Sequence, residues 1–238
     1  FKQDAEGPPR GTRSARVVAV AAQKGGVGKT TTAVNLACAL TLHHRQRVLL
    51  LDMDPQAHVH ASLRAVARPG PVAVSDILLA EPARDLMDAV VPSAVEGLSL
   101  TPPDKALHEA EGRLASKVGR EVILQAALET ARTWFDTIVI DCPPNLGNLT
   151  LNALLAADEV LVPCDMSLLA LEGVADLLDT VQTVNHRLRH PLDVAGVLRT
   201  RVDGRTRKQT EAIDGALLVR VDRGQAEFDR TLLVALRD

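Results

Sequence analysis

A glycine-rich loop, flanked by an apolar run and a helical pattern, constrains the fold of this chain more than any other feature. Residues 16–23 are apolar and rich in valine, which predicts a buried strand. The loop KGGVGKTT spans residues 24–31, and residues 31–43 have the composition of a helix. Glycines let backbone N–H groups wrap around anionic oxygens, and the start of a helix adds a partial positive charge. The sequence therefore predicts a phosphate-binding loop of the P-loop type.

Each part of this loop has an expected task. Gly25, Gly26 and Gly28 give the backbone its freedom, and Lys29 is expected to reach the β- and γ-phosphates. The hydroxyl of Thr30 is expected to bind Mg²⁺. The predicted nucleotide-binding set is Lys24, Gly25, Gly26, Val27, Gly28, Lys29, Thr30 and Thr31.

The loop departs from the general P-loop pattern at its start. Gln23 stands where the pattern has a glycine, and Lys24 is an additional lysine. Lys24 cannot easily reach the phosphates of its own subunit together with Lys29. Two interpretations stay open: a solvated surface lysine, or a lysine that crosses a dimer interface and touches the partner's nucleotide.

Short apolar runs alternate with helical patterns along the rest of the chain. Further strands are expected at residues 47–54, 98–101, 136–141, 159–163 and 194–200, and further helical segments at residues 75–79, 83–90, 121–133, 148–156 and 168–188. Because these strands are continuous apolar runs, they predict an α/β fold with a mostly parallel, doubly wound sheet and helices on both faces. In the helix after the loop, Val34, Cys38 and Leu42 are expected along one face.

The length of 238 residues fits one domain. Residues 1–15 are polar and predict a flexible N-terminal arm, so the P-loop domain is expected over residues 16–238. Within it, residues 209–238 are atypical. Residues 228–237 place apolar side chains on one helical face, which indicates a packing helix or a membrane-targeting helix; a lysine-rich polar face, typical of the second, is missing.

Charge and cysteine usage narrow the possible surroundings of the chain. The net charge of −3 gives no general attraction to nucleic acid, so any such contact needs a local basic patch. Cys38, Cys142 and Cys164 show neither paired nor metal-ligand spacing, which favours reduced thiols in a cytoplasm. No apolar run is long enough to cross a membrane, and no membrane contact is expected.

Three aspartates follow or end apolar strands. Asp52 and Asp54 lie two residues apart at the end of a strand, so their side chains share a face. Asp54 is nearer the carboxyl end, where ligands bind in open α/β sheets, and a carboxylate there can position and polarise a water. A capping or ion-pair role is the alternative for both. Asp141 ends the strand TIVID, where an acid is costly unless it holds a metal-bound water.

Taken together, these motifs resemble the ParA/MinD superfamily of ATPases. KGGVGKTT resembles its deviant Walker A motif, LLLDMDPQ at residues 49–56 the ParA segment after the second strand, and residues 135–154 the Walker B segment. Residues 160–173 (VLVPCDMSLLALEG) and 196–207 (GVLRTRVDGRTR) resemble the ParA segments that follow. The resemblance runs from about residue 16 to residue 208.

The resemblance implies a Mg²⁺-dependent ATPase that binds ATP and ADP in a bacterial cytoplasm. Such a protein forms a homodimer on ATP binding, binds double-stranded DNA nonspecifically at the nucleoid, and is stimulated by a ParB-like partner during chromosome or plasmid partition. It implies that Asp54 carries the attacking water and that Asp141 is the Walker B aspartate. Asp52 is expected to support either the Mg²⁺ shell or the switch loop. The predicted catalytic residues are Lys24, Lys29 and Asp54, and the predicted metal residues are Thr30, Asp52 and Asp141.

A basic strip near the end of the resemblance is the candidate DNA contact. It consists of Arg199, Arg201, Arg205, Arg207 and Lys208, with Arg187 and Arg189 upstream at the end of a predicted helix. Such a strip can neutralise phosphates without reading bases. A solvated charged loop is the alternative, and some of these arginines could contact adenine or a dimer partner instead.

Three other functions stay open beside partition. One is a MinD-like ATPase that positions itself on membranes, and another is a nucleotide-binding protein with degenerate hydrolysis. The third, a metabolic enzyme such as an iron–sulfur reductase, is disfavoured because no cysteine is placed for a dimer-bridging cluster.

Overall fold

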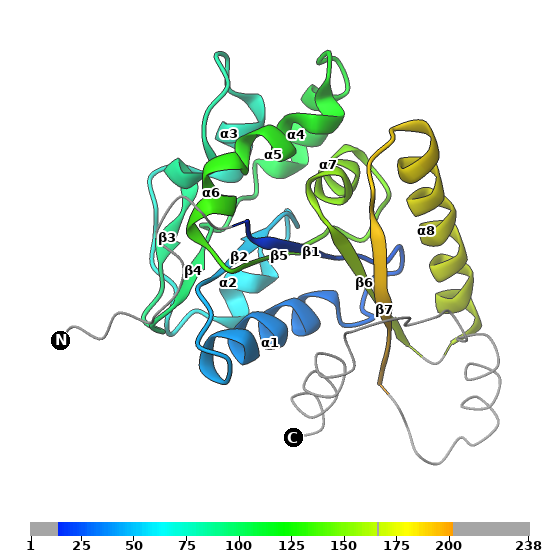
Figure 1. Ribbon diagram of the computed structural model, residues 1–238, viewed down its shortest axis with the longest axis horizontal. Coiled ribbons are helices and arrows are strands. Elements are labelled where there is room, and N and C mark those ends of the chain that lie inside the picture. Colours follow the sequence, from blue (N-terminus) through cyan, green and yellow to red (C-terminus); the bar gives the residue numbers. More distant parts are fainter. Residues whose placement is uncertain (1–13, 166, 202–238) are drawn as a thin grey trace.

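One seven-stranded sheet forms the centre of the protein. The computed structural model describes residues 14–165 and 167–201. The strands are β1 (Arg16–Val20), β2 (Val48–Asp52), β3 (Val91–Pro92), β4 (Leu98–Leu100), β5 (Thr137–Asp141), β6 (Glu159–Asp165) and β7 (Asp193–Thr200). Their order is β3-β4-β2-β5-β1-β6-β7, and every neighbouring pair is parallel except β3 with β4 (Figure 1).

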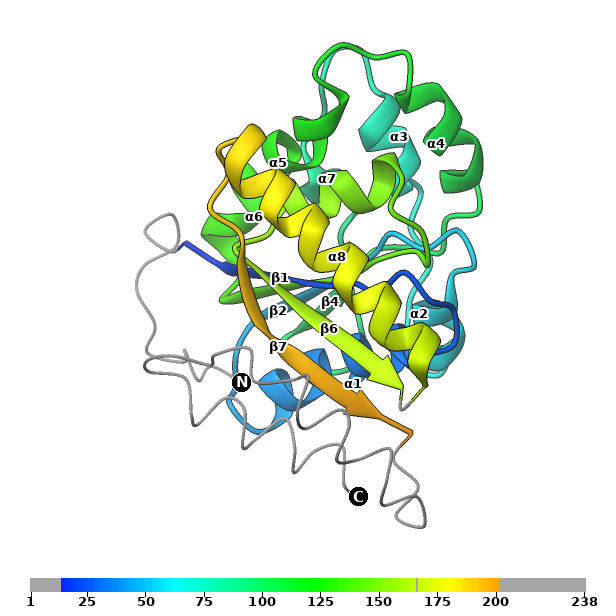
Figure 2. The ribbon, with the colours of Figure 1, turned by 90° about the vertical axis from the view of Figure 1, so that its right-hand side faces the viewer.

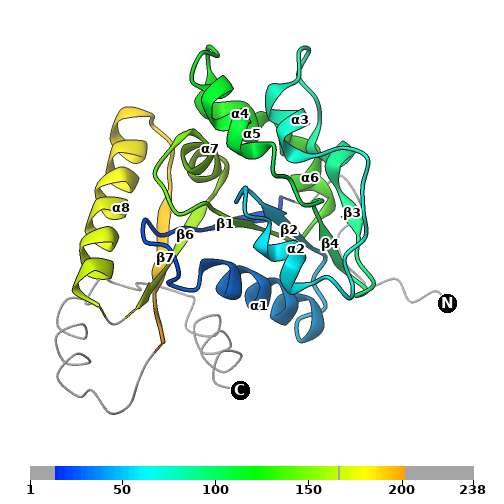
Figure 3. The same cartoon turned by 180° about the vertical axis from the view of Figure 1, so that it is seen from behind.

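Helices cover both faces of this sheet. They are α1 (Lys29–Leu42), α2 (His58–Ser62), α3 (Val74–Leu79), α4 (Leu107–Leu114), α5 (Ile123–Ala127), α6 (Glu129–Trp134), α7 (Asn148–Ala156) and α8 (Leu168–Arg187), with the 3₁₀ turns η1 (Leu86–Ala89) and η2 (Arg120–Val122). Seen from behind, α1 and α2 lie together on one face (Figure 3), and α3 to α8 lie on the other. The doubly wound, mostly parallel α/β fold predicted from the apolar runs is confirmed.

The strands form because their side chains are buried on both faces of the sheet. Every residue of β2 and β5 is buried, and so are Val17, Val18, Ala19 and Val20 of β1. Alternate residues of β1, β2, β5 and β6 supply two separate apolar clusters, one under α1 and α2 and one under the remaining helices. Burial on both sides explains why these strands are continuous apolar runs without alternation.

The apolar face expected for α1 was wrong. Leu42 is 62% exposed, and Val34 and Cys38 are only half-buried. The side of α1 that packs on the sheet consists of Ala33, Leu36, Ala37 and Leu40, all buried. These small and medium side chains bring the helix close to the sheet. The positions chosen from the sequence belong to a neighbouring stripe of the same helix.

The single helix expected over residues 121–133 is three shorter pieces, η2, α5 and α6. In a continuous helix the N–H of Leu124 would bond to the carbonyl of Arg120. Here the side-chain amide of Asn152 on α7 takes both groups: its oxygen accepts from Leu124 N at 3.1 Å, and its nitrogen donates to Arg120 O at 2.7 Å. A tertiary contact therefore replaces the local one.

Other element boundaries also differ from the expectation. Only η1 forms within residues 83–90, and α2, β3 and α4 were not expected. The other predicted strands and helices agree with the structure to within a few residues. The predicted N-terminal arm at residues 1–15, apart from its last two residues, and the predicted helix at residues 228–237 lie outside the described residues.

Candidate phosphate and metal site

The candidate site lies at the carboxyl ends of three adjacent strands. β5 is hydrogen-bonded to β1 on one side and β2 on the other, and Asp141 pairs in register with both Val20 and Asp52. The loop after β1, residues 21–28, therefore starts beside the aspartates that end β2 and β5. This edge is where ligands bind in open α/β sheets. The topology brings together the loop and the three aspartates that the sequence singled out.

Two glycines shape the loop where it turns into α1. Gly26 has φ +75° and Gly28 has φ +95°, a region that side chains rarely adopt. Gly28 is the N-cap of α1, and its carbonyl accepts the first helical bond, from Thr32 N at 2.8 Å. The left-handed cap leaves the first backbone N–H groups of a 14-residue helix directed at the loop, which is the arrangement that binds phosphate.

Lys29 lies at the bottom of this loop, with only 6% of its surface exposed. Its ammonium donates to the carbonyl of Lys24 at 3.2 Å, a bond that closes the loop on itself. Burial lowers the pKa of Lys29, and the negative charges of Asp141 and Asp54 raise it in part. A buried cation with one backbone partner is well placed to exchange that partner for a phosphate oxygen.

Asp141 is the carboxylate best placed to bind a cation. Its side chain is fully buried, and the hydroxyl of Thr30 is near enough to stabilise its charge, yet neither carboxylate oxygen has a well-formed hydrogen bond among the described residues. Burial raises the pKa of Asp141 to about 7, and Thr30 and the charge of Lys29 oppose that rise. An orphaned carboxylate beside a hydroxyl fits Mg²⁺.

Mg²⁺ sites need few protein ligands. The ion is usually held by one or two carboxylates together with waters and substrate phosphates. Within the part of the chain that the structure describes, no group of three or more His, Cys, Asp or Glu side chains is arranged around a common point. Thr30 and Asp141 fit a Mg²⁺ site of this kind, in which nucleotide phosphates and waters supply the other ligands.

Asp52 and Asp54 are held by the turn that follows β2. One oxygen of Asp52 accepts from Asp54 N at 3.0 Å, and Asp54 accepts from Gln56 N at 2.9 Å. The second oxygen of Asp52 is buried without a hydrogen bond, and burial with the nearby charge of Asp141 raises the pKa of Asp52 well above its usual value. Asp54 is also buried, and the hydrogen bond from Gln56 N fixes its carboxylate in this turn.

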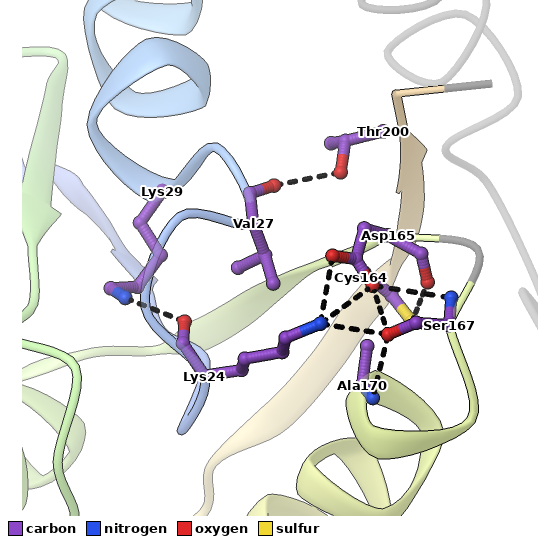
Figure 4. A network of polar contacts seen from close by, with 8 residues as sticks. All are labelled: Lys24, Val27, Lys29, Cys164, Asp165, Ser167, Ala170 and Thr200. Carbon is purple, nitrogen blue, oxygen red and sulfur yellow. Dashed lines mark hydrogen bonds and ion pairs between the residues drawn. The ribbon is translucent and has the colours of Figure 1, made fainter. Parts of the chain in front are cut away.

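Lys24 lies on the opposite side of the loop from Lys29 (Figure 4). Its ammonium bonds to both oxygens of Asp165, at 3.0 and 3.3 Å, and to the hydroxyl of Ser167 at 2.8 Å. Burial would raise the pKa of Asp165, but hydrogen bonds from Ser167 and Lys24 hold it below its usual value. In this structure Lys24 is thus engaged within its own subunit.

Thr200, at the end of β7, makes a second contact with the loop. Its hydroxyl donates to the carbonyl of Val27 at 2.7 Å, and its methyl group would meet a side chain at Gly28 at 3.6 Å (Figure 4). Sequence reasoning missed Thr200, Asp165 and Ser167. Asp165 was detectable, because it ends an apolar strand as Asp141 does; nothing in the sequence marks Thr200.

The predicted DNA residues are only partly described. Arg199 and Arg201 are exposed at the carboxyl end of β7, beside the loop, whereas Arg205, Arg207 and Lys208 lie outside the described residues. Arg187 ends α8 and Arg189 follows it, so both come shortly before the start of β7, a strand of 8 residues that spans about 26 Å at 3.3 Å per residue (Figure 2). These upstream arginines therefore do not join Arg199 and Arg201 in one patch.

Known proteins are similar to this chain over most of its length. A family model described as an AAA domain (AAA_31) matches residues 15–194. The sporulation initiation inhibitor protein Soj of Bacillus subtilis is 41% identical over 199 residues, which cover 84% of this chain and 78% of Soj. The chain belongs to the ParA/MinD superfamily of ATPases.

Two further matches show the range within this superfamily. The chromosome partitioning protein ParA of Myxococcus xanthus is 40% identical over 190 residues, 80% of this chain and 66% of that protein. A crystal structure of cobyrinic acid a,c-diamide synthase from Mycobacterium smegmatis, with bound ADP and magnesium, is 39% identical. It covers 87% of this chain and 82% of its own, with a TM-score of 0.76.

Two further observations on this ParA/MinD-type chain concern its described helices and its three cysteines. Among the described helices, none combines the length and apolarity that a membrane span requires. Burial raises the pKa of all three cysteine thiols, Cys38, Cys142 and Cys164. Thiols of this kind are poor nucleophiles.

Proposed function

We propose that this protein is a ParA-like ATPase of chromosome or plasmid partition, which binds ATP or ADP with Mg²⁺ at the described site. The observation that carries the proposal is the convergence of the phosphate loop, buried Lys29 and the orphaned carboxylate of Asp141 at one edge of the sheet. The similarity to Soj and to ParA of M. xanthus supports the partition role.

Different residues of this chain bind the phosphates, hold Mg²⁺ and position the attacking water. The loop N–H groups and Lys29 bind the phosphates. Thr30 and Asp141 would hold Mg²⁺, and Asp52 would support the Mg²⁺ shell. When bound, Mg²⁺ neutralises charge on the phosphate oxygens. Asp54 positions the attacking water, because its buried carboxylate is fixed by the turn to Gln56. Positioning and electrostatics are most of what phosphoryl transfer requires.

ATP binding would close a homodimer that binds double-stranded DNA without sequence preference at the nucleoid, in a bacterial cytoplasm. Arg199 and Arg201 lie at the edge of the sheet that carries the nucleotide site, so nucleotide state can alter the surface they occupy. Hydrolysis, stimulated by a ParB-like partner, would release the DNA.

The decisive experiment measures binding to a duplex of arbitrary sequence with ATP, ADP and no nucleotide, across a salt series. We expect retention with ATP only, with affinity falling steeply as salt rises because phosphate contacts release counterions. Equal retention in all three nucleotide states, or none, would count against the partition role. Phosphate release measured on the same samples separates a working ATPase from one that binds nucleotide without turnover.

An amide-forming enzyme is the second candidate, since the M. smegmatis structure carries a diamide synthase name. The thiols argue against a cysteine-dependent amide transfer, because burial raises the pKa of each of the three cysteines. ATP-dependent amidation of a carboxylate-rich corrinoid acid, without DNA retention, would favour this candidate. A MinD-like role would instead appear as ATP-dependent sedimentation with anionic liposomes.

A further inference from the structure

The contact of Lys24 with Asp165 and Ser167 joins the phosphate loop to the start of α8. Asp165 ends β6, and Ser167 is the N-cap of α8, where its hydroxyl accepts from Ala170 N at 3.3 Å. The same hydroxyl donates to Asp165 at 2.6 Å, so the two acceptors of the Lys24 ammonium are themselves fixed to each other (Figure 4). The groups that accept hydrogen bonds from Lys24 are therefore held in place by their own contacts.

The backbone of the loop also lies against α8. A side chain at Gly173, one turn into α8, would be 3.6 Å from Cβ of Gln23 and 3.9 Å from the backbone nitrogen of Lys24. Residues 23–24 therefore lie close to α8, in addition to the bonds that the lysine side chain makes. The ammonium points away from Lys29 and toward the end of β6.

An ammonium has three donors, and all of those of Lys24 have acceptors within reach in this one site. Lys24 cannot make these bonds and also reach a nucleotide in a second copy of the chain. The lysine side chain is 33% exposed, however, and ion pairs at such sites are weak. A phosphate group offered by a second copy could therefore displace Asp165.

We propose that Asp165 and Ser167 are positioning residues that hold Lys24 within its own subunit, and that Lys24 must leave them before it can act on the nucleotide of a second copy. The inference rests on the ATP-dependent dimer of the proposed function. The contact opposes dimerisation until bound ATP makes the exchange favourable. Asp165→Asn weakens it by removing the negative charge while preserving side-chain size.

The first measurement tests the contact without reference to dimerisation. The nucleotide-free protein is treated with an amine-acylating reagent, and modification of each lysine is followed by peptide mass spectrometry. Lys24 in Asp165→Asn should react severalfold faster than in the unmodified sequence. Lys117, which bonds to Glu81 and to the carbonyl of Leu79, is the internal reference and should not change. Asp88→Asn, which breaks the exposed pair with Arg84, is the matched control.

The second measurement is sedimentation with ATP in an Asp54→Ala background, which slows hydrolysis in the proposed mechanism. Two such contacts must open per dimer, so Asp165→Asn should dimerise at a concentration on the order of tenfold lower. Circular dichroism and a thermal melt check that the variant is folded.

The outcomes separate this inference from the proposed function. Faster Lys24 acylation with dimerisation at lower concentration supports the inference. Unchanged acylation, or dimerisation that requires more protein, overturns it even if the unmodified sequence dimerises with ATP. If acylation rises but neither protein dimerises at any concentration, the dimer of the proposed function is wrong, and the restraining role fails with it.

Discussion

The carboxylate of Glu111 accepts hydrogen bonds from the backbone N–H groups of Asn148 and Leu149, at 2.6 and 3.2 Å. It thereby joins α4 to the first turn of α7 and supplies the cap that Gly147, the N-cap residue, cannot provide. A Cβ at Gly147 would lie 2.1 Å from Glu111 Oε1, so a side chain there would displace the carboxylate from this position. Because α7 follows the loop after Asp141, Glu111 fixes the far end of that loop.

Replacement of Glu111 by alanine should lower the free energy of unfolding by about 1–2 kcal/mol, because two N–H groups at a helix start lose a charged acceptor. Urea denaturation followed by circular dichroism measures the change. Glu109→Ala is the control, since Glu109 is exposed on the same helix, and it should change stability by less than about 0.5 kcal/mol. Equal effects of the two changes would contradict the capping role.

The sequence predicted the sheet, and which residues gather at the candidate site, better than it predicted the helices. Buried parallel strands are apolar throughout, so β2 and β5 could be recognised without knowledge of their neighbours. Asp54 and Asp141 could be recognised because a carboxylate at the end of such a strand has few structural uses. These features depend on local sequence alone.

Features that depend on distant partners could not be predicted. The break between Arg120 and Leu124 depends on Asn152, and the cap of α7 depends on Glu111. The engagement of Lys24 depends on Asp165, 141 residues away in the sequence. A single sequence shows the residue types in these contacts but gives no sign of which ones meet.

The face of α1 provides a direct test of its packing. Leu36→Ala should lower the free energy of unfolding by about 2–5 kcal/mol, because the lost side chain leaves a cavity under the sheet. Leu42→Ala should cost less than about 0.5 kcal/mol, since Leu42 is largely exposed. Chemical denaturation of the two variants compares them directly. Similar losses of unfolding free energy in the two variants would mean that the face with Leu42 packs against the sheet, as expected from the sequence.

The stability of the protein without Mg²⁺ and nucleotide should fall as pH rises from about 4 to about 7. The folded-state pKa of Asp141 is about 7, against 3.8 ordinarily, so between these values the folded chain binds more protons than the unfolded one. The raised pKa of Asp52 acts in the same direction. Asp141 shares a buried site with Asp52, Asp54, Lys29 and Cys142. Burial there favours the protonated carboxyls, so their ionisation lowers the stability of the folded chain.

Asp141→Asn should remove the part of this pH dependence that comes from Asp141, and the part that comes from Asp52 should remain. At pH 8 the variant should be more stable than the unmodified sequence, by on the order of 3 kcal/mol, and near pH 4 the two should be similar. Urea unfolding in the presence of EDTA, at a series of pH values, measures the difference between the two proteins. A difference that is constant with pH would show that folding does not change the pKa of Asp141, and would contradict the raised pKa.

Two substitutions at Asp54 distinguish a role in hydrolysis from a role in folding the turn. Asp54 accepts a hydrogen bond from Gln56 N, and asparagine can still accept it, whereas alanine cannot. If the carboxylate positions and polarises the attacking water, both variants should lose about 10²–10⁴-fold in the rate of phosphate release while they still bind labelled ATP. If Asp54 only caps the turn, Asp54→Asn should hydrolyse ATP at close to the unmodified rate and Asp54→Ala alone should be impaired. Single-turnover conversion of labelled ATP to ADP, with protein in excess over Mg²⁺-ATP and the reaction quenched in acid, separates the two cases, since it measures the chemical step before the products leave. If both variants are slow, the charge of the side chain, and not its hydrogen bond to the backbone, is the property that hydrolysis requires.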